Sequence, residues 1–188
     1  MYAHSNTKFS NKSREPPNIY DDYQGQQELF KVIAKQKQEN SGGGDCLWYS
    51  LLQSGILSSN INCPNEARNE AVVLILQEYT KPRSYLKKLA NKKELDNYLT
   101  KINTPKNWTQ GIDQIGYELI FYTLSGYYNT CIVLLINVRN MIISKVYNKY
   151  GRKRIFVMLS SEHYEFCNCN NDSFLQQIPI KNFEMIMP

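Results

Sequence analysis

Apolar residues recur every three or four positions along most of the chain, which is the spacing found on the buried side of a helix. Leu95, Leu99 and Ile102 form one such stripe. Gly55 is expected to end one of these helices and Asn65 to cap the next. The helices that this pattern predicts cover residues 26–39, 46–54, 66–79, 84–90, 93–102 and 110–125.

Beyond residue 130 the pattern becomes that of short strands rich in Val, Ile, Phe and Tyr. Residues 148–152, Asn-Lys-Tyr-Gly-Arg, have the composition of a hairpin turn. The helices therefore come first and a meandering sheet comes last, which predicts an α+β fold with helices packed around a small central sheet. The predicted strands are residues 131–137, 142–148, 155–160 and 162–168.

The chain is expected to form one domain, residues 26–188, preceded by a polar N-terminal arm, residues 1–25. The longest apolar run, residues 131–136, has the length of a strand and is too short to cross a membrane. The N-terminal segment lacks the apolar core of a secretory signal. We therefore expect a cytoplasmic protein with no membrane partner.

The composition favours a packed domain, because 42% of the residues are hydrophobic and 12% are aromatic. A monomer is expected. The net charge of +5 is well below that of a dedicated nucleic-acid binder. A basic segment, residues 145–154, leaves a nucleic-acid-binding module open as an alternative, but a solvated turn explains such a cluster more simply. No nucleic-acid partner is expected.

The five cysteines do not have the spacing of a disulfide framework, and their number is odd. Cys167 and Cys169 form a Cys-x-Cys pair, with His163 and Glu165 as the only other possible ligands close by in the sequence. A structural zinc site normally needs two ligand pairs. We therefore expect free thiols, a reducing compartment, and no metal or other cofactor.

Cys46 stands where a nucleophile would be activated. It follows three glycines and Asp45 and begins a predicted helix. The positive end of a helix dipole stabilises a thiolate. The glycines allow backbone N–H groups to point at a developing oxyanion. The alternative is a small buried cysteine that follows a linker.

The chain has two histidines, and one of them, His4, lies in the polar arm. The other, His163, lies in a predicted strand two residues before Glu165, so both side chains project from the same face. A carboxylate in that position can orient an imidazole and stabilise its charged form. An exposed His-x-Glu on an edge strand is the alternative. A cysteine at a helix start with a remote histidine is the arrangement of a thiol protease.

Residues 43–51, GGDCLWYSL, resemble the nucleophile motif of the ovarian-tumour (OTU) family of deubiquitinating cysteine proteases, in which D-G-[DN]-C-L precedes an aromatic residue. Residues 163–165, His-Tyr-Glu, are similar to the His-Tyr-[DN] element of that family. Trp108, followed by a helix and a strand, resembles the middle segment of the family. The resemblance covers about residues 40–170 and implies an OTU-like, papain-like fold.

Three residues depart from the family pattern. Gly43 replaces an aspartate of the oxyanion loop, and Thr109 stands where a glycine usually follows the tryptophan. Glu165 replaces Asp or Asn and is longer by one methylene, so Asn168 and Asn170 are further candidates for the group that orients the histidine.

The resemblance implies a thiol-dependent hydrolase that cleaves the isopeptide bond after the C-terminal glycine of ubiquitin or of a ubiquitin-like protein, including an interferon-induced modifier. The residues it implies have three roles. They are Cys46, His163 and Glu165 for catalysis, Gly43, Gly44 and Asp45 for the oxyanion hole, and Trp48, Tyr164 and Trp108 for substrate binding.

Two further interpretations stay open. One is a ubiquitin-binding pseudoenzyme with the same fold, which the changes at Gly43 and Glu165 would suit. The other is a papain-like peptidase that acts on ordinary peptide bonds. By analogy with compact members of the family, a viral or pathogen source, a host-directed role and a location in the host cytoplasm are also expected. The sequence leaves the preference for a chain linkage open.

Overall fold

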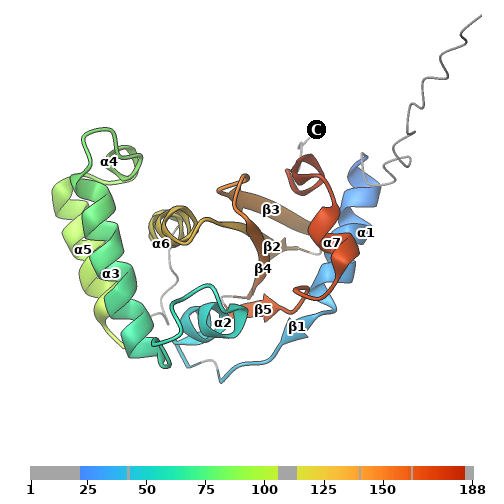
Figure 1. Cartoon of the computed structure of the whole chain (residues 1–188), viewed down its shortest axis with the longest axis horizontal. Coiled ribbons are helices and arrows are strands. Elements are labelled where there is room, and N and C mark those ends of the chain that lie inside the picture. Colours follow the sequence, from blue (N-terminus) through green and yellow to red (C-terminus); the bar gives the residue numbers. More distant parts are fainter. Residues whose placement is uncertain (1–21, 42, 106–113, 140, 162, 185–188) are drawn as a thin grey trace, which may run out of the picture.

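A five-stranded sheet stands between two layers of helices in the computed structural model, which describes residues 22–41, 43–105, 114–139, 141–161 and 163–184 (Figure 1). The elements are α1 (Tyr23–Ala34), β1 (Lys37–Gln38), α2 (Cys46–Ser54), α3 (Pro64–Thr80), α4 (Leu86–Leu89), α5 (Lys92–Asn103), α6 (Gln114–Tyr127), β2 (Thr130–Val138), β3 (Met141–Tyr147), β4 (Lys153–Ser160), β5 (His163–Cys167), α7 (Ser173–Gln177) and the 3-10 helix η2 (Ile180–Phe183). The predicted α+β fold, with helices packed around a small sheet, is confirmed. Within the described residues, no helix combines the length and apolar character that crossing a bilayer requires.

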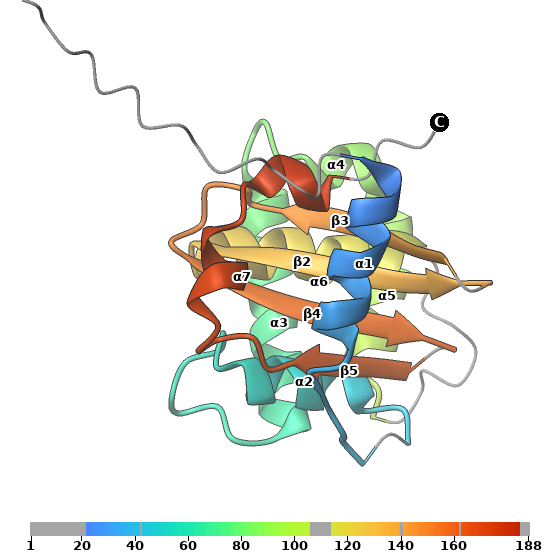
Figure 2. The same ribbon diagram turned by 90° about the vertical axis from the view of Figure 1, so that its right-hand side faces the viewer.

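Each face of the sheet has its own hydrophobic core. α1 and α7 cover one face, where Phe30 packs with Leu135 and Phe156 (Figure 2). α2 and α6 cover the other face, and α3 and α5 pack outside α6 (Figure 1). Trp48 and Leu51 belong to this second core. The strands are buried on both faces, which explains why β2 is a continuous apolar run rather than an alternating one.

The predicted helices exist, but some of their ends differ. The helix over residues 46–54 is confirmed, and Gly55 ends it in the left-handed conformation with φ 62°. The prediction that Asn65 caps the next helix is wrong, because α3 begins at Pro64, two residues before the predicted start, with Cys63 as its N-cap. Proline suits a first helical position, since the N–H it lacks would have no helical acceptor there. The start of the predicted helix 110–125 lies partly outside the described residues.

The predicted helix over residues 26–39 is too long. α1 ends at Ala34, and Lys37 and Gln38 then form β1. β1 pairs with β5 in antiparallel register, with Lys37 opposite Cys167 and Gln38 opposite Phe166. A pairing partner about 130 residues away in the chain cannot be read from local periodicity. β1 thus covers the end of β5 at Phe166 and Cys167, and its two residues do not extend opposite Glu165 or His163.

The predicted meander and its hairpin turn are also wrong. The strand order is β1-β5-β4-β2-β3, and β2 and β4 run parallel. The turn after β3 therefore crosses the start of β2 before the chain enters β4. Gly151 lies in this crossing, where the N–H of Arg152 donates to the carbonyl of Asn129 at 2.8 Å. A Cβ atom on Gly151 would stand 2.2 Å from the backbone N of Cys131. The crossing requires glycine at this position.

Gly151→Ala is expected to lower the free energy of unfolding by about 3 kcal/mol, because the new methyl group overlaps backbone atoms that cannot turn aside. Gly126→Ala is the matched control, since a Cβ there would have no atom within 4 Å and alanine favours the helix by about 0.5 kcal/mol. Urea unfolding measures both variants. Equal stability of the two variants would contradict the close approach at Gly151.

Candidate active site

Cys46 is the first residue of α2, at the end of a loop whose glycines have left-handed backbones. Gly43 has φ 65° and Gly44 has φ 87°, conformations that other residues adopt at a cost. Asp45 is the N-cap, and its carbonyl accepts the N–H of Tyr49 at 3.0 Å. The sequence therefore places the thiol at the positive end of a helix, beside a loop that can present N–H groups.

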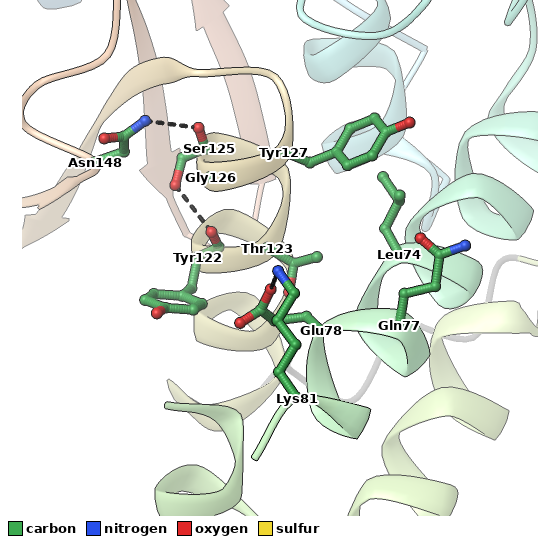
Figure 3. A pocket seen from close by; sticks show the side chains of 10 residues that line it. All are labelled: Leu74, Gln77, Glu78, Lys81, Tyr122, Thr123, Ser125, Gly126, Tyr127 and Asn148. Carbon is green, nitrogen blue, oxygen red and sulfur yellow. Dashed lines mark hydrogen bonds and ion pairs between the residues drawn. The ribbon is translucent and has the colours of Figure 1, made fainter. Parts of the chain in front are cut away.

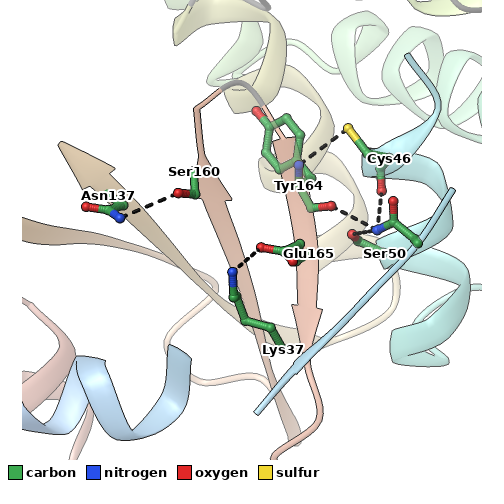
Figure 4. Close-up of polar contacts among 8 residues, drawn as sticks. Lys37, Cys46, Ser50, Asn137, Ser160, Tyr164 and Glu165 are labelled. Carbon is green, nitrogen blue, oxygen red and sulfur yellow. Dashed lines mark hydrogen bonds and ion pairs between the residues drawn. The ribbon is translucent and has the colours of Figure 1, made fainter. Parts of the chain in front are cut away.

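The sulfur of Cys46 touches the beginning of β5. The backbone N–H of Tyr164 donates to Sγ of Cys46 at 3.4 Å (Figure 4). His163 is the residue before Tyr164 and is half-buried at the start of the strand. The structure thus brings Cys46 and His163, which are more than a hundred residues apart in sequence, to one place. The imidazole of His163 has no hydrogen bond to a described residue.

Glu165 projects from the same face of β5 as His163, but its carboxylate is paired elsewhere. Oε2 accepts from Nζ of Lys37 on β1 at 2.7 Å, and the two side chains are 11% and 37% exposed (Figure 4). A carboxylate this buried is costly without a partner, and Lys37 supplies one. Oε1 makes no hydrogen bond to a described residue.

The other candidates for an orienting group lie away from His163. Asn168 and Asn170 follow the opposite end of β5 and are exposed. The pairing register points instead to the strands beside β5. His163 stands opposite Ser160, which stands opposite Asn137, and Nδ2 of Asn137 donates to Oγ of Ser160 at 3.5 Å (Figure 4). Only the strand order reveals this row of polar residues, so the sequence pattern gave no signal for it.

Asp45 forms an ion pair with a buried arginine. Its side chain does not cap α2 but forms an ion pair with Arg68 of α3. The Arg68 side chain is 1% exposed and lies over the ring of Trp48, 5.4 Å from its centre. This pair fixes the loop residue immediately before the nucleophile. An apparently ordinary arginine in a helix thus belongs to the site, and nothing in its local sequence marked it.

The chain resembles known proteins in its fold rather than in its sequence. No protein-family model matches the sequence, and no curated protein matches it either. Among solved structures, the OTU domain of OTUD1 is similar, with a TM-score of 0.53 and 14% identity over 74% of this chain and 93% of that domain. The Hazara virus OTU bound to ubiquitin is also similar, with a TM-score of 0.51 and 18% identity over 71% of this chain and 82% of that one.

The chain has an OTU-like fold. At such low identity the likeness extends to the fold alone. The roles of Cys46, His163 and Glu165, and of the loop from Gly43 to Asp45, stay predictions.

Two residues expected to line a substrate groove in this OTU-like fold are instead part of its core. Trp48 is fully buried, and Tyr164 is 3% exposed. Both side chains belong to the core in which α2 packs against β5. Burial, and then the neighbouring Tyr117 and Cys46, raise the pKa of the Tyr164 phenol. The third expected groove residue, Trp108, lies outside the described residues, as do Thr109 and His4.

The two cysteines near the C-terminus, Cys167 and Cys169, are buried. Burial, and then Cys169, raise the pKa of Cys167 to about 12. Burial, and then Asp172, raise the pKa of Cys169 to about 12 as well. Both thiols therefore stay protonated at neutral pH. Among the residues that the structure describes, no group of three or more His, Cys, Asp or Glu side chains could hold a metal ion.

A pocket between α3 and α6 is a separate feature of the OTU-like fold (Figure 3). Its lining includes Tyr122, Tyr127 and Asn148 together with an ion pair in which Lys81 donates to Glu78 at 2.5 Å. It contains neither a cysteine nor a histidine. The proposed nucleophile and base therefore lie outside this pocket.

Asp45→Ala is expected to lower the free energy of unfolding by about 3 kcal/mol, because it leaves Arg68 buried without its counter-charge. Asp96→Ala removes an exposed ion pair with Lys92, whose side chains are 63% and 56% exposed, and is expected to cost less than about 1 kcal/mol. Urea unfolding compares the two. A loss at Asp45 no greater than that at Asp96 would show that the buried pair does not hold the loop.

Proposed function

We propose that the chain is a thiol-dependent deubiquitinase that hydrolyses the isopeptide bond after the C-terminal glycine of ubiquitin or of a ubiquitin-like protein. The observation that supports the proposal is the contact between Sγ of Cys46 and the N–H of Tyr164, the residue that follows His163. The OTU-like fold supports the substrate class, because the similar Hazara virus OTU is bound to ubiquitin.

The proposed reaction is an acyl transfer in two steps. His163 takes the proton of the Cys46 thiol, and the thiolate attacks the carbonyl carbon of the glycine. N–H groups of the loop from Gly43 to Cys46 stabilise the oxyanion that forms. His163 then protonates the departing lysine amine, which leaves a thioester on Cys46. Water, activated by His163, hydrolyses this thioester and restores the free thiol.

In this proposal Glu165 helps to orient His163, but only weakly, because its carboxylate is paired with Lys37. The ion pair is mostly buried, so it fixes the carboxylate two residues beyond His163 on the same face of β5. A partly neutralised carboxylate orients an imidazole more weakly than a free one. Glu165 is therefore a secondary contributor beside Cys46 and His163.

The biological setting is part of the same proposal. The likeness to a viral OTU supports a host-directed role, with ubiquitin conjugates or an interferon-induced modifier in the host cytoplasm as targets. We also propose a monomer that needs no nucleic acid and no membrane.

A second candidate function, a ubiquitin-binding pseudoenzyme, is favoured by one observation. The carboxylate of Glu165 is paired with Lys37, and the imidazole of His163 has no hydrogen bond to a described residue. An imidazole without an orienting partner is a weaker base. A ubiquitin probe with a C-terminal electrophile distinguishes the two functions, because only an active nucleophile becomes attached to it.

Cys46→Ala is expected to abolish both attachment of the ubiquitin probe and cleavage of a panel of di-ubiquitins, because it removes the proposed nucleophile. Cys63→Ala is the matched control, since Cys63 is a half-buried free cysteine at the start of α3. It is expected to keep full activity. Probe attachment that survives in Cys46→Ala would assign the nucleophile to another residue, and absence of attachment in the wild type would favour the pseudoenzyme.

His163→Ala is expected to lower kcat by about 10³-fold, because it removes the general base and acid of both steps. Glu165→Gln is expected to lower kcat by only about tenfold, since its carboxylate is already paired with Lys37. Steady-state hydrolysis of a fluorogenic ubiquitin substrate measures both variants. Equal losses would make Glu165 a full partner of His163, and no loss at Glu165 would assign the orienting role to another group.

A further inference from the structure

Asn40 lies between β1 and α2, and its side-chain amide joins the two elements that meet at the site. Nδ2 donates to the backbone carbonyl of Tyr164 on β5 at 2.9 Å. It also lies 3.2 Å from Oγ of Ser50 and 3.4 Å from the carbonyl of Cys46, both on α2. One amide nitrogen therefore has acceptors on the helix that carries the proposed nucleophile and on the strand that carries the proposed base.

These contacts form a closed set with the thiol. Tyr164 donates its N–H to Sγ of Cys46, and its carbonyl accepts from Asn40. Cys46 supplies the sulfur for the first contact, and its own carbonyl lies near Asn40. Each of the three residues thus contacts the other two. Loss of the amide would remove a link between the start of α2 and β5.

A shift of α2 along β5 would matter more for chemistry than for folding. Proton transfer between a thiol and an imidazole needs the sulfur and the nitrogen within hydrogen-bond reach of each other. A misplacement of about 1 Å costs roughly 10²-fold in rate. The extensive packing of α2 on β5 would survive the same shift, because the buried side chains of Leu47, Leu51 and Phe166 hold the two elements together.

We propose that Asn40 is a positioning residue of the active site, which holds Cys46 at the start of β5 by bridging Cys46 and Tyr164. The inference rests on the proposed function for its effect on turnover. Its geometric part concerns Cys46 alone and is measured without ubiquitin.

Gln53 offers a matched control. Its Nε2 donates to the carbonyl of Glu39 at 3.0 Å, so it ties α2 to the same connecting segment as Asn40 does. This hydrogen bond is exposed and lies at the far end of the helix from Cys46. Gln53→Ala therefore removes one tie between the same elements and leaves the site untouched.

The experiment compares the full chain with Asn40→Ala, Asn40→Asp and Gln53→Ala. Asn40→Asp keeps the shape of the side chain and removes its donors. The first measurement is kcat and KM with a fluorogenic ubiquitin substrate. Both Asn40 variants are expected to lose about 10²-fold in kcat with KM within about twofold, and Gln53→Ala is expected to match the wild type.

The second measurement is the rate at which iodoacetamide alkylates Cys46 between pH 5 and 9, followed by peptide mass spectrometry. The Asn40 variants are expected to react more slowly at pH 7 and to need a higher pH for half-maximal rate, because Tyr164 no longer holds its N–H on the sulfur. Gln53→Ala is expected to keep the wild-type profile. A merely structural role of Asn40 would lower the melting temperature without moving this profile.

The outcomes separate the inference from the proposed function. A wild type that cleaves no ubiquitin substrate, together with a shifted alkylation profile in Asn40→Ala, supports the positioning role and refutes the deubiquitinase. An unchanged profile overturns the positioning role, as do equal losses in the Asn40 and Gln53 variants. Failure of both Asn40 variants to fold also overturns it, because Asn40 would then determine the fold rather than the geometry of the site.

Discussion

The contact between the start of α2 and the start of β5 is the constraint on which the rest of the site depends. It joins Cys46 to Tyr164 across 118 positions of sequence, so the chain must close a long loop before the thiol has a neighbour. The free energy for that closure comes from apolar packing, because Leu47 and Leu51 of α2 share a core with Phe166 of β5. The hydrophobic core thus places the polar site, and the amide of Asn40, with acceptors on α2 and β5, adjusts its register.

Electrostatics then decides which side chains near the site are free to act. Asp45 and Glu165 both lie close to Cys46 or His163, and each has a cationic partner, Arg68 or Lys37. Removing a carboxylate from water is costly, so partners of this kind are needed where a site is built into a core. Both carboxylates are therefore held in place by ion pairs next to the site. The imidazole of the half-buried His163, in contrast to the two carboxylates, has no ion pair with a described residue.

Local pattern was sufficient for the features that local chemistry determines. The start of α2 at Cys46, the left-handed Gly55 and the strands β2 to β5 follow from periodicity and turn residues. Features that depend on distant partners were not predictable. β1 exists because β5 supplies its hydrogen bonds, and the course of the chain at Gly151 depends on where β2 begins. Asn40 and Arg68 were missed for the same reason, since each acts on residues brought to it by the fold. Trp48 was misplaced because an aromatic residue beside a nucleophile suits a groove and a core equally well.

The length of the Glu165 side chain and the presence of β1 belong to one arrangement. Lys37 stands opposite Cys167, so Glu165 reaches Lys37 along the diagonal between the two strands. Diagonal neighbours in an antiparallel pair are about 7–8 Å apart, a span that long side chains bridge and short ones do not. An aspartate at this position is shorter by one methylene and would reach less far toward Lys37. The extra methylene therefore helps the carboxylate to reach β1. The ion pair that results joins β1 to β5 at the edge of the sheet.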